Sequence, residues 1–151
     1  MRTWAKVAER RERLTMAESE RKPAARIPGW VAVVVVVGAA LMALGAVLAA
    51  VRPAMLVSPH DEINAAVQVY AGYLTSRNLA LAGMLLAALL MRARGALTVL
   101  MVLTGIVQLL DAGIDGRDGR WMLVPGVLVF AIVYFFGAAR IAPRGWWKGA
   151  E

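Results

Sequence analysis

The residues best suited to chemistry in this chain lie within apolar stretches of the sequence. Arg77 and Asn78 are adjacent in the run YAGYLTSRNLALAG at residues 70–83, and Asp111 lies in the next hydrophobic segment. Charged side chains are costly inside a bilayer, so they pair with one another or mark a functional site. We therefore expect Arg77 to pair with Asp111. An arginine in such a place can bind an oxyanion, and an aspartate can exchange a proton.

The two charged residues also share one predicted depth in the membrane. Arg77 precedes Met91 by 14 residues, Asp111 follows Ala96 by 15, and a short basic turn separates Met91 from Ala96. At about 1.5 Å per helical residue, both lie roughly 21–23 Å from that turn, inside the outer edge of a hydrocarbon core of roughly 30 Å. Antiparallel helices joined by a tight turn are neighbours, so the two side chains can meet.

Further polar residues lie at helical spacing around this pair. Tyr70 and Tyr73 fall on or near the face of Arg77, because the three positions are i, i+3 and i+7. On the next segment, Gln108 shares the face of Asp111. Arg77 and Asp111 are the candidates for catalysis. The candidate substrate-binding residues are Tyr70, Tyr73, Arg77, Asn78, Gln108 and Asp111.

A structural role for the pair is an equally open alternative. Arg77 is near enough to the membrane boundary for its guanidinium to reach water, and Asp111 can cap the outer end of its helix without binding anything. Ion pairs inside membranes often fix only the register of two helices. The sequence thus leaves two possibilities, a structural clasp and a polar pocket that opens outward and is extended by Asp115.

Membrane-spanning helices must position these residues. The chain has 151 residues, of which 60% are hydrophobic, and this is too apolar for an ordinary soluble domain of that size. We predict an all-α fold, an antiparallel bundle of four transmembrane helices within one membrane domain at residues 29–140. The predicted spans are residues 29–51, 71–91, 96–112 and 121–139.

Local signals predict where some of these helices begin and end. Ser58 suits an N-cap and Pro59 a first helical position, so the second helix is expected to begin near Pro59. The glycine- and aspartate-rich run at 113–120 is expected to form the turn after the third span. The first span carries a face of small residues on which another helix can pack closely. These residues are Gly38, Ala39, Ala43, Gly45 and Ala49.

Positive charge predicts how the chain crosses the membrane. Of the 17 Lys and Arg residues, eight lie in residues 1–28, two in the turn at 92–95, three from residue 140 onward, and four on the opposite side. By the positive-inside rule both termini are cytoplasmic, which gives an N-in, C-in topology. We expect a multi-pass protein of the cell (plasma) membrane, with basic tails at 1–28 and 141–151.

Several functional classes are disfavoured by the residue content. The chain has no cysteine, which excludes disulfides, thiolate nucleophiles and Cys-ligated metals. His60 lies beside two acids, but a helix start explains this cluster better than a metal site, so no metal is expected. Trp146 and Trp147 suit an interfacial anchor rather than a nucleic-acid contact. With no haem-ligand pair or quinone signature, we expect no cofactor and no nucleic-acid partner.

The motif around Arg77 resembles that of a family of small bacterial membrane proteins. In DoxX-like proteins and related four-helix families, an Arg is followed by Asp or Asn and a glycine-containing apolar helix, and an Asp lies near the end of the third span. Those positions correspond here to Arg77, Asn78, Gly83 and Asp111. The resemblance covers about residues 30–140. It implies a four-helix membrane bundle, and some members are linked to redox or oxidative-stress complexes.

Three functions are compatible with these observations. The first is a non-enzymatic accessory or scaffold subunit that packs against a membrane protein partner or a second copy through its small-residue face. The second is a small membrane enzyme, an isomerase, cyclase, hydrolase or redox-linked enzyme acting on a lipid-soluble substrate. In that enzyme Asp111 would exchange a proton, Arg77 would bind an oxyanion, and Tyr73 or Gln108 would orient the substrate. An oligomeric transporter ranks last, because no charge lies in the inner half of any span.

Overall fold

The computed structural model describes residues 26–56 and 62–143, and within these ranges the regular structure is entirely helical. Four helices, each long and apolar enough to cross a membrane, account for most of it. Their bounds are α2 Gly29–Val51, α3 Ala65–Leu90, α4 Arg94–Arg117 and α5 Val124–Ile141, with a short 3₁₀ helix, η1, at Pro53–Leu56. Most of the predicted tails at 1–28 and 141–151, namely residues 1–25 and 144–151, lies outside the described residues, and so does His60.

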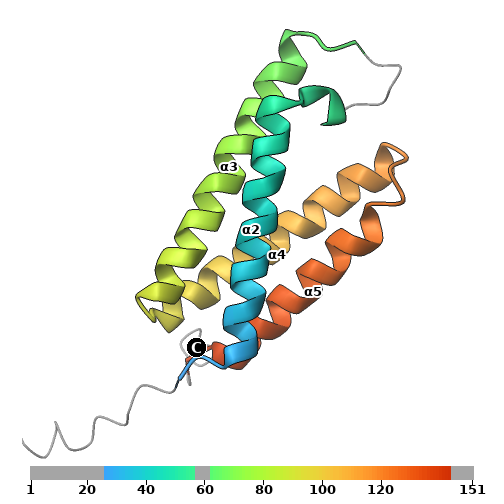
Figure 1. Cartoon of the computed structure of the whole chain (residues 1–151). Coiled ribbons are helices and arrows are strands. Elements are labelled where there is room, and N and C mark those ends of the chain that lie inside the picture. Colours follow the sequence, from blue (N-terminus) through green and yellow to red (C-terminus); the bar gives the residue numbers. More distant parts are fainter. Residues whose placement is uncertain (1–25, 57–61, 144–151) are drawn as a thin grey trace, which may run out of the picture.

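The helices form two antiparallel pairs that meet at one end and diverge toward the other (Figure 1). α2 packs along α3 and α4 packs along α5, whereas the two pairs contact each other much less. We call α2 with α3 the first hairpin and α4 with α5 the second hairpin. The closed end is where the hairpins meet, at the start of α2, the α3–α4 turn and the end of α5. The opposite end is the open end.

The buried core is concentrated at the closed end, where all four helices contribute side chains. Arg94 adds a polar contact there, because its Nη2 donates to the Ile141 carbonyl at 3.0 Å and ties the start of α4 to the end of α5. Within a bilayer, close van der Waals packing holds helices together, so the closed end is where all four helices stabilise one another. The core consists of Val31, Val35, Leu85, Ala88, Leu97, Leu100, Met101, Tyr134, Ala138 and Ile141.

The small residues of α2 are used for packing within the chain. Gly38, Ala39 and Ala49 of the predicted small-residue face are buried, and Gly45 lies beside the Asn78 side chain of α3. Thr75 of α3 donates a hydrogen bond to the Ala46 carbonyl of α2 at 3.0 Å. α3 therefore approaches α2 closely around Gly45, whereas Gly38 packs against Tyr134 of α5.

The second helix begins later than the sequence suggested. The expectation of a start near Pro59 is wrong, because residues 62–64 are not helical and α3 begins at Ala65. The Asn64 side-chain oxygen accepts hydrogen bonds from the backbone N–H groups of Ala66 and Val67, at 3.0 and 3.1 Å. These are donors that a helix start leaves without partners. Asn64 is thus the N-cap that the sequence interpretation assigned to Ser58, which lies outside the described residues.

The third helix runs further than expected, and the turn after it is shorter. The prediction of an end near Ala112 with a turn from 113 to 120 is wrong, since α4 continues to Arg117. Gly119 adopts φ +76°, and the Gly119 and Arg120 N–H groups donate to the carbonyls of Gly116 and Asp115. This is a Schellman ending, in which Gly119 in the left-handed region stops the helix. The fourth helix accordingly begins at Val124 rather than Trp121.

Candidate functional site

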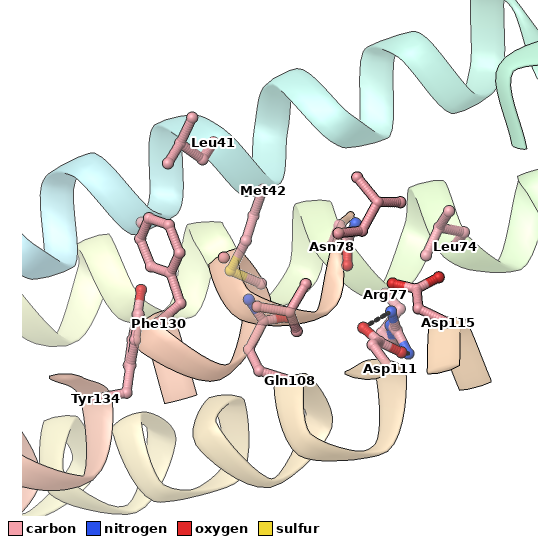
Figure 2. Close-up of a pocket in the computed structure, with 14 residues that line it drawn as sticks. Leu41, Met42, Leu74, Arg77, Asn78, Gln108, Asp111, Asp115, Phe130 and Tyr134 are labelled. Atoms are coloured by element: carbon pink, nitrogen blue, oxygen red, sulfur yellow. Dashed lines mark hydrogen bonds and ion pairs between the residues drawn. The ribbon is translucent and has the colours of Figure 1, made fainter. Parts of the chain in front are cut away.

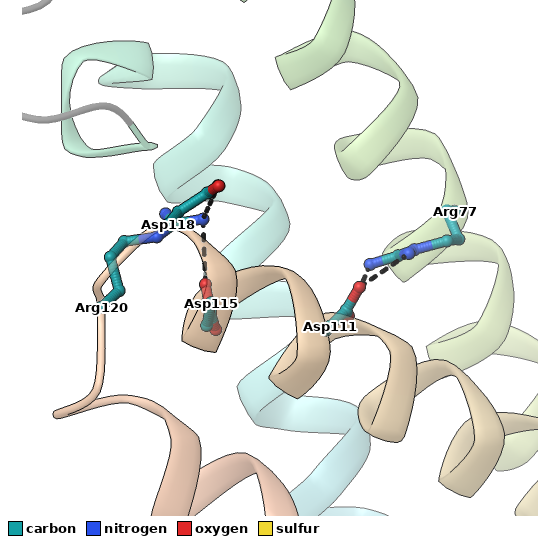
Figure 3. A network of polar contacts seen from close by, with 5 residues as sticks. All are labelled: Arg77, Asp111, Asp115, Asp118 and Arg120. Carbon is teal, nitrogen blue, oxygen red and sulfur yellow. Dashed lines mark hydrogen bonds and ion pairs between the residues drawn. The ribbon is translucent and has the colours of Figure 1, made fainter.

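The predicted ion pair between Arg77 and Asp111 is confirmed, and it links the two hairpins. Arg77 Nη1 lies 3.2 Å from Asp111 Oδ1, and Arg77 Nη2 lies 2.9 Å from Asp111 Oδ2. Figure 3 shows the parallel arrangement of the guanidinium and the carboxylate between α3 and α4. The two side chains remain 38% and 27% exposed. The pair therefore has bidentate geometry and also an accessible surface.

A pocket of about 380 Å³ lies beside this ion pair, and all four helices line it. We call it the interhairpin pocket, because the first and second hairpins form its two walls (Figure 2). Its volume falls within the range of roughly 300–1,000 Å³ found for small-molecule sites. The apolar lining residues are Leu41, Met42, Leu74, Leu123, Val127 and Phe130, with Gly38 and Gly126. The polar lining residues are Arg77, Asn78, Gln108, Asp111, Asp115 and Tyr134.

A smaller cavity of about 200 Å³ adjoins the interhairpin pocket at the open end. The two cavities share Gln108, Asp111 and Asp115 as lining residues, and the smaller one is also lined by Tyr70 and Arg120. The helical face of α4 predicted from the spacing of Gln108, Asp111 and Asp115 is thus confirmed. It forms a continuous polar strip along both cavities.

Each acid that lines the interhairpin pocket is paired with an arginine. Asp111 pairs with Arg77, and Asp115 pairs with Arg120 at 2.9 Å across the α4–α5 turn (Figure 3). Asp118 lies 3.8 Å from the same guanidinium. The pairing compensates the charges of the lining acids, so the pocket presents hydrogen-bonding groups without an excess of either sign.

The remaining candidate residues from the sequence lie in different places. Asn78 lines the interhairpin pocket, on the side of Gly45 of α2. Tyr70 lines only the adjoining cavity, and Tyr73 lines neither cavity and is 71% exposed. The structure therefore brings Arg77, Asn78, Gln108 and Asp111 together, with Tyr70 nearby and Tyr73 apart.

The sequence interpretation missed Tyr134 of α5, which lines the end of the interhairpin pocket nearest the core. This residue is only 1% exposed, and its hydroxyl has no hydrogen-bond partner among the described residues. The hydroxyl is packed against Gly38, where an added Cβ would collide with it. Tyr134 precedes Phe135 and Phe136 in an aromatic run near the end of the predicted fourth span. A phenol inside an apolar span was the signal that could have identified it.

Among the residues that the structure describes, no group of three or more His, Asp or Glu side chains is placed to hold a metal ion. Comparison of the chain with protein-family models, with curated proteins and with solved structures finds no match. The resemblance to DoxX-like proteins therefore stays a prediction from the motif around Arg77.

Proposed function

We propose that this chain is a membrane protein that binds a lipid-soluble small molecule in the interhairpin pocket. The observation that carries the proposal is the pocket itself, an apolar cavity of about 380 Å³ into which a few polar groups from α3, α4 and α5 converge. Ligand sites in proteins usually combine such apolar walls with a small number of placed polar groups, and helix bundles commonly hold them between helices.

The position of the ion pair supports binding over a purely structural clasp. A clasp needs only buried contact between Arg77 and Asp111, whereas here both side chains are partly exposed and line a cavity. Each Asp111 oxygen accepts one hydrogen bond from Arg77 and can accept another. The pair thus holds the hairpins together and also offers acceptors to a bound molecule.

Two functions expected from the sequence receive less support. A scaffold subunit depended on the small-residue face of α2, and α3 occupies much of that face. Proton exchange at Asp111 would compete with its contact to Arg77, because both carboxylate oxygens are bonded to the guanidinium. A membrane protein partner, a second copy and an enzymatic reaction therefore remain predictions of lower rank.

We also propose an orientation, with the closed end at the cytoplasmic face of a bacterial plasma membrane. Arg92, Arg94 and Arg140 lie at the closed end without a described acid near them, whereas at the open end Arg52, Arg117 and Arg120 are accompanied by Asp115 and Asp118. This distribution supports the positive-inside assignment made from the whole sequence. The interhairpin pocket would then open toward the outer leaflet.

The proposed binding can be tested by filling the pocket. Val127 lines it, whereas Val129 lies on the same helix and is exposed on the outside. Wild type, Val127→Trp and Val129→Trp would be purified in a mild detergent, and retained small molecules would be identified by mass spectrometry. We expect one lipid-soluble species to be retained by wild type and Val129→Trp and lost from Val127→Trp. The same species profile in all three folded proteins would refute the proposal.

A further inference from the structure

We infer that the pocket takes an uncharged, elongated molecule with a hydrogen-bonding oxygen at each end, one of which bonds to the Tyr134 hydroxyl. The inference rests on the binding function proposed above and specifies the class of ligand. It follows from three observations: the unsatisfied Tyr134 hydroxyl, the distance between the polar ends of the pocket, and the paired charges.

The inner end of the pocket contains a hydrogen-bonding group that the protein leaves without a partner. The Tyr134 side chain is buried, and its hydroxyl has no partner among the described residues. A buried polar group without a partner is costly, above all within a membrane. The hydroxyl lies against Gly38 and is covered by protein atoms, and the interhairpin pocket is the volume that the Tyr134 side chain lines. A ligand oxygen that displaces the covering atoms at this end of the pocket would satisfy the hydroxyl.

The outer polar groups lie about two helical turns from Tyr134. Gly38 of α2 contacts the Tyr134 hydroxyl, and Gly45 of α2 lies beside the Asn78 amide. Seven residues of helix separate these glycines, which corresponds to about 10 Å along α2. Between them the walls are apolar, formed by Leu41, Met42 and Phe130 of the lining set. A fitting molecule therefore has an apolar body of about 10 Å between its two polar ends.

The charge balance of the pocket favours a ligand without net charge. Asp111 and Asp115 are each engaged by an arginine, at 2.9 Å in both cases. A charged ligand would either remain uncompensated in a largely apolar site or displace one of these pairs, and both are costly. A carbonyl or hydroxyl oxygen can instead accept from the amide N–H groups of Asn78 and Gln108, and a hydroxyl can also donate to the carboxylates, without disturbing the pairs.

Simple alkyl probes can test each element of this inference on the full-length protein in phosphatidylcholine nanodiscs. The main probe is octanediol with terminal hydroxyls, whose extended length is close to two helical turns. Its binding would be compared with octanol, octanoate, and the shorter butanediol and longer dodecanediol, with protein-free nanodiscs subtracted. Tyr134→Phe removes only the hydroxyl. Tyr73→Phe removes the same group from a side chain that lines neither cavity.

We expect Tyr134→Phe to weaken octanediol binding about three- to tenfold, which is the value of one hydrogen bond, while octanol binding stays unchanged. Tyr73→Phe should leave both affinities unchanged. In wild type, octanediol should bind more tightly than octanoate and than either diol of different length. This length series keeps the inference testable even if Tyr134→Phe does not fold.

Two results would overturn the inference. If Val127→Trp abolishes octanediol binding but Tyr134→Phe and chain length have no effect, the ligand class is wrong and the binding function stands. If no probe binds wild type above protein-free nanodiscs, and Val127→Trp retains the same molecules as wild type, both the inference and the proposed function fail.

Discussion

The bond between Arg77 and Asp111 is the main polar contact described between the two hairpins. Both guanidinium Nη atoms bond to the carboxylate, and each side chain keeps some exposure. In a pair of this kind, loss of one partner is more damaging than loss of both, because a lone charge remains in a poorly hydrated site. The pair should therefore behave as a unit.

Replacing Arg77 alone should destabilise the protein more than replacing both partners. We expect Arg77→Met to lower the free energy of unfolding by about 1–3 kcal/mol, because Asp111 is left uncompensated. The double variant Arg77→Met, Asp111→Leu should recover at least half of that loss. Unfolding in mixed micelles of SDS and dodecyl maltoside measures both. Arg52→Met, at an exposed arginine outside the pocket, is the control and should have little effect.

Equal destabilisation by the single and double variants would show that the two charges do not act as a pair. Exchange of the residues, Arg77→Asp with Asp111→Arg, adds a second comparison. It should keep the hairpins linked but alter the pocket wall, so stability should be largely restored while binding of the retained molecule is weakened.

The sequence predicted the pair of Arg77 and Asp111 but not all of the residues that surround it. Arg77 and Asp111 were identifiable because charges are conspicuous in apolar spans and because helical rise placed them at one depth. Tyr134 was not identifiable from the sequence, since its place in the pocket depends on contact with Gly38, which belongs to a helix far away in sequence. Tyr73 was placed near the pair by spacing, but small rotations of a helix decide whether such a residue faces a pocket or its surroundings.

At the level of the helices, the start of α3 is set by one side chain and the end of α4 by the backbone conformation of one residue. Asn64 caps α3 through its side-chain oxygen, and Gly119 ends α4 in the left-handed region. The centres of all four helices agreed with the apolar runs of the sequence. The ends of the helices did not agree with the prediction. Ser58 and Asn64 are both suitable N-caps for α3, and several glycines in residues 113–119 could each end α4. The ion pair between Asp115 and Arg120 spans the turn and favours Gly119 as the residue that ends α4.

Removal of the Asn64 cap should loosen the start of α3. We expect Asn64→Ala to cost about 0.5–2 kcal/mol locally, since the N–H groups of Ala66 and Val67 lose their acceptor. Hydrogen exchange at these two amides should become faster, whereas Asn64→Asp, which keeps the acceptor, should leave their protection unchanged. Unaltered exchange in Asn64→Ala would show that the helix starts elsewhere.

In the whole molecule, the packed core and the proposed binding site lie toward different ends. The core lies at the closed end, and the pocket lies where the hairpins diverge (Figure 1). The sequence predicted four helices and their antiparallel order. It could not predict that they form two diverging pairs, because this depends on how closely particular surfaces approach. α2 packs along α3, while it contacts α5 over a much shorter length, with Gly38 against Tyr134.

Truncation of a core residue at the closed end should therefore reduce stability more than truncation of an exposed one. Leu85 is fully buried in the core and Leu90, on the same helix, is exposed. We expect Leu85→Ala to cost about 2 kcal/mol through the cavity it leaves, and Leu90→Ala to cost little because lipid can replace the lost contacts. Thermal unfolding of both variants in detergent measures the difference. Equal losses would contradict the assignment of Leu85 to the packed core.

The most direct test of the central claim is to capture the bound molecule in the cell membrane. Met42 lines the interhairpin pocket, and Met84 of α3 is exposed. A photoreactive diazirine analogue of methionine would be placed at each position in turn, and the adducts formed in intact cells would be weighed by mass spectrometry. We predict one defined small-molecule adduct at position 42 and a broad set of phospholipid adducts at position 84. The same phospholipid mixture at both positions would contradict the claim that the pocket selects a ligand.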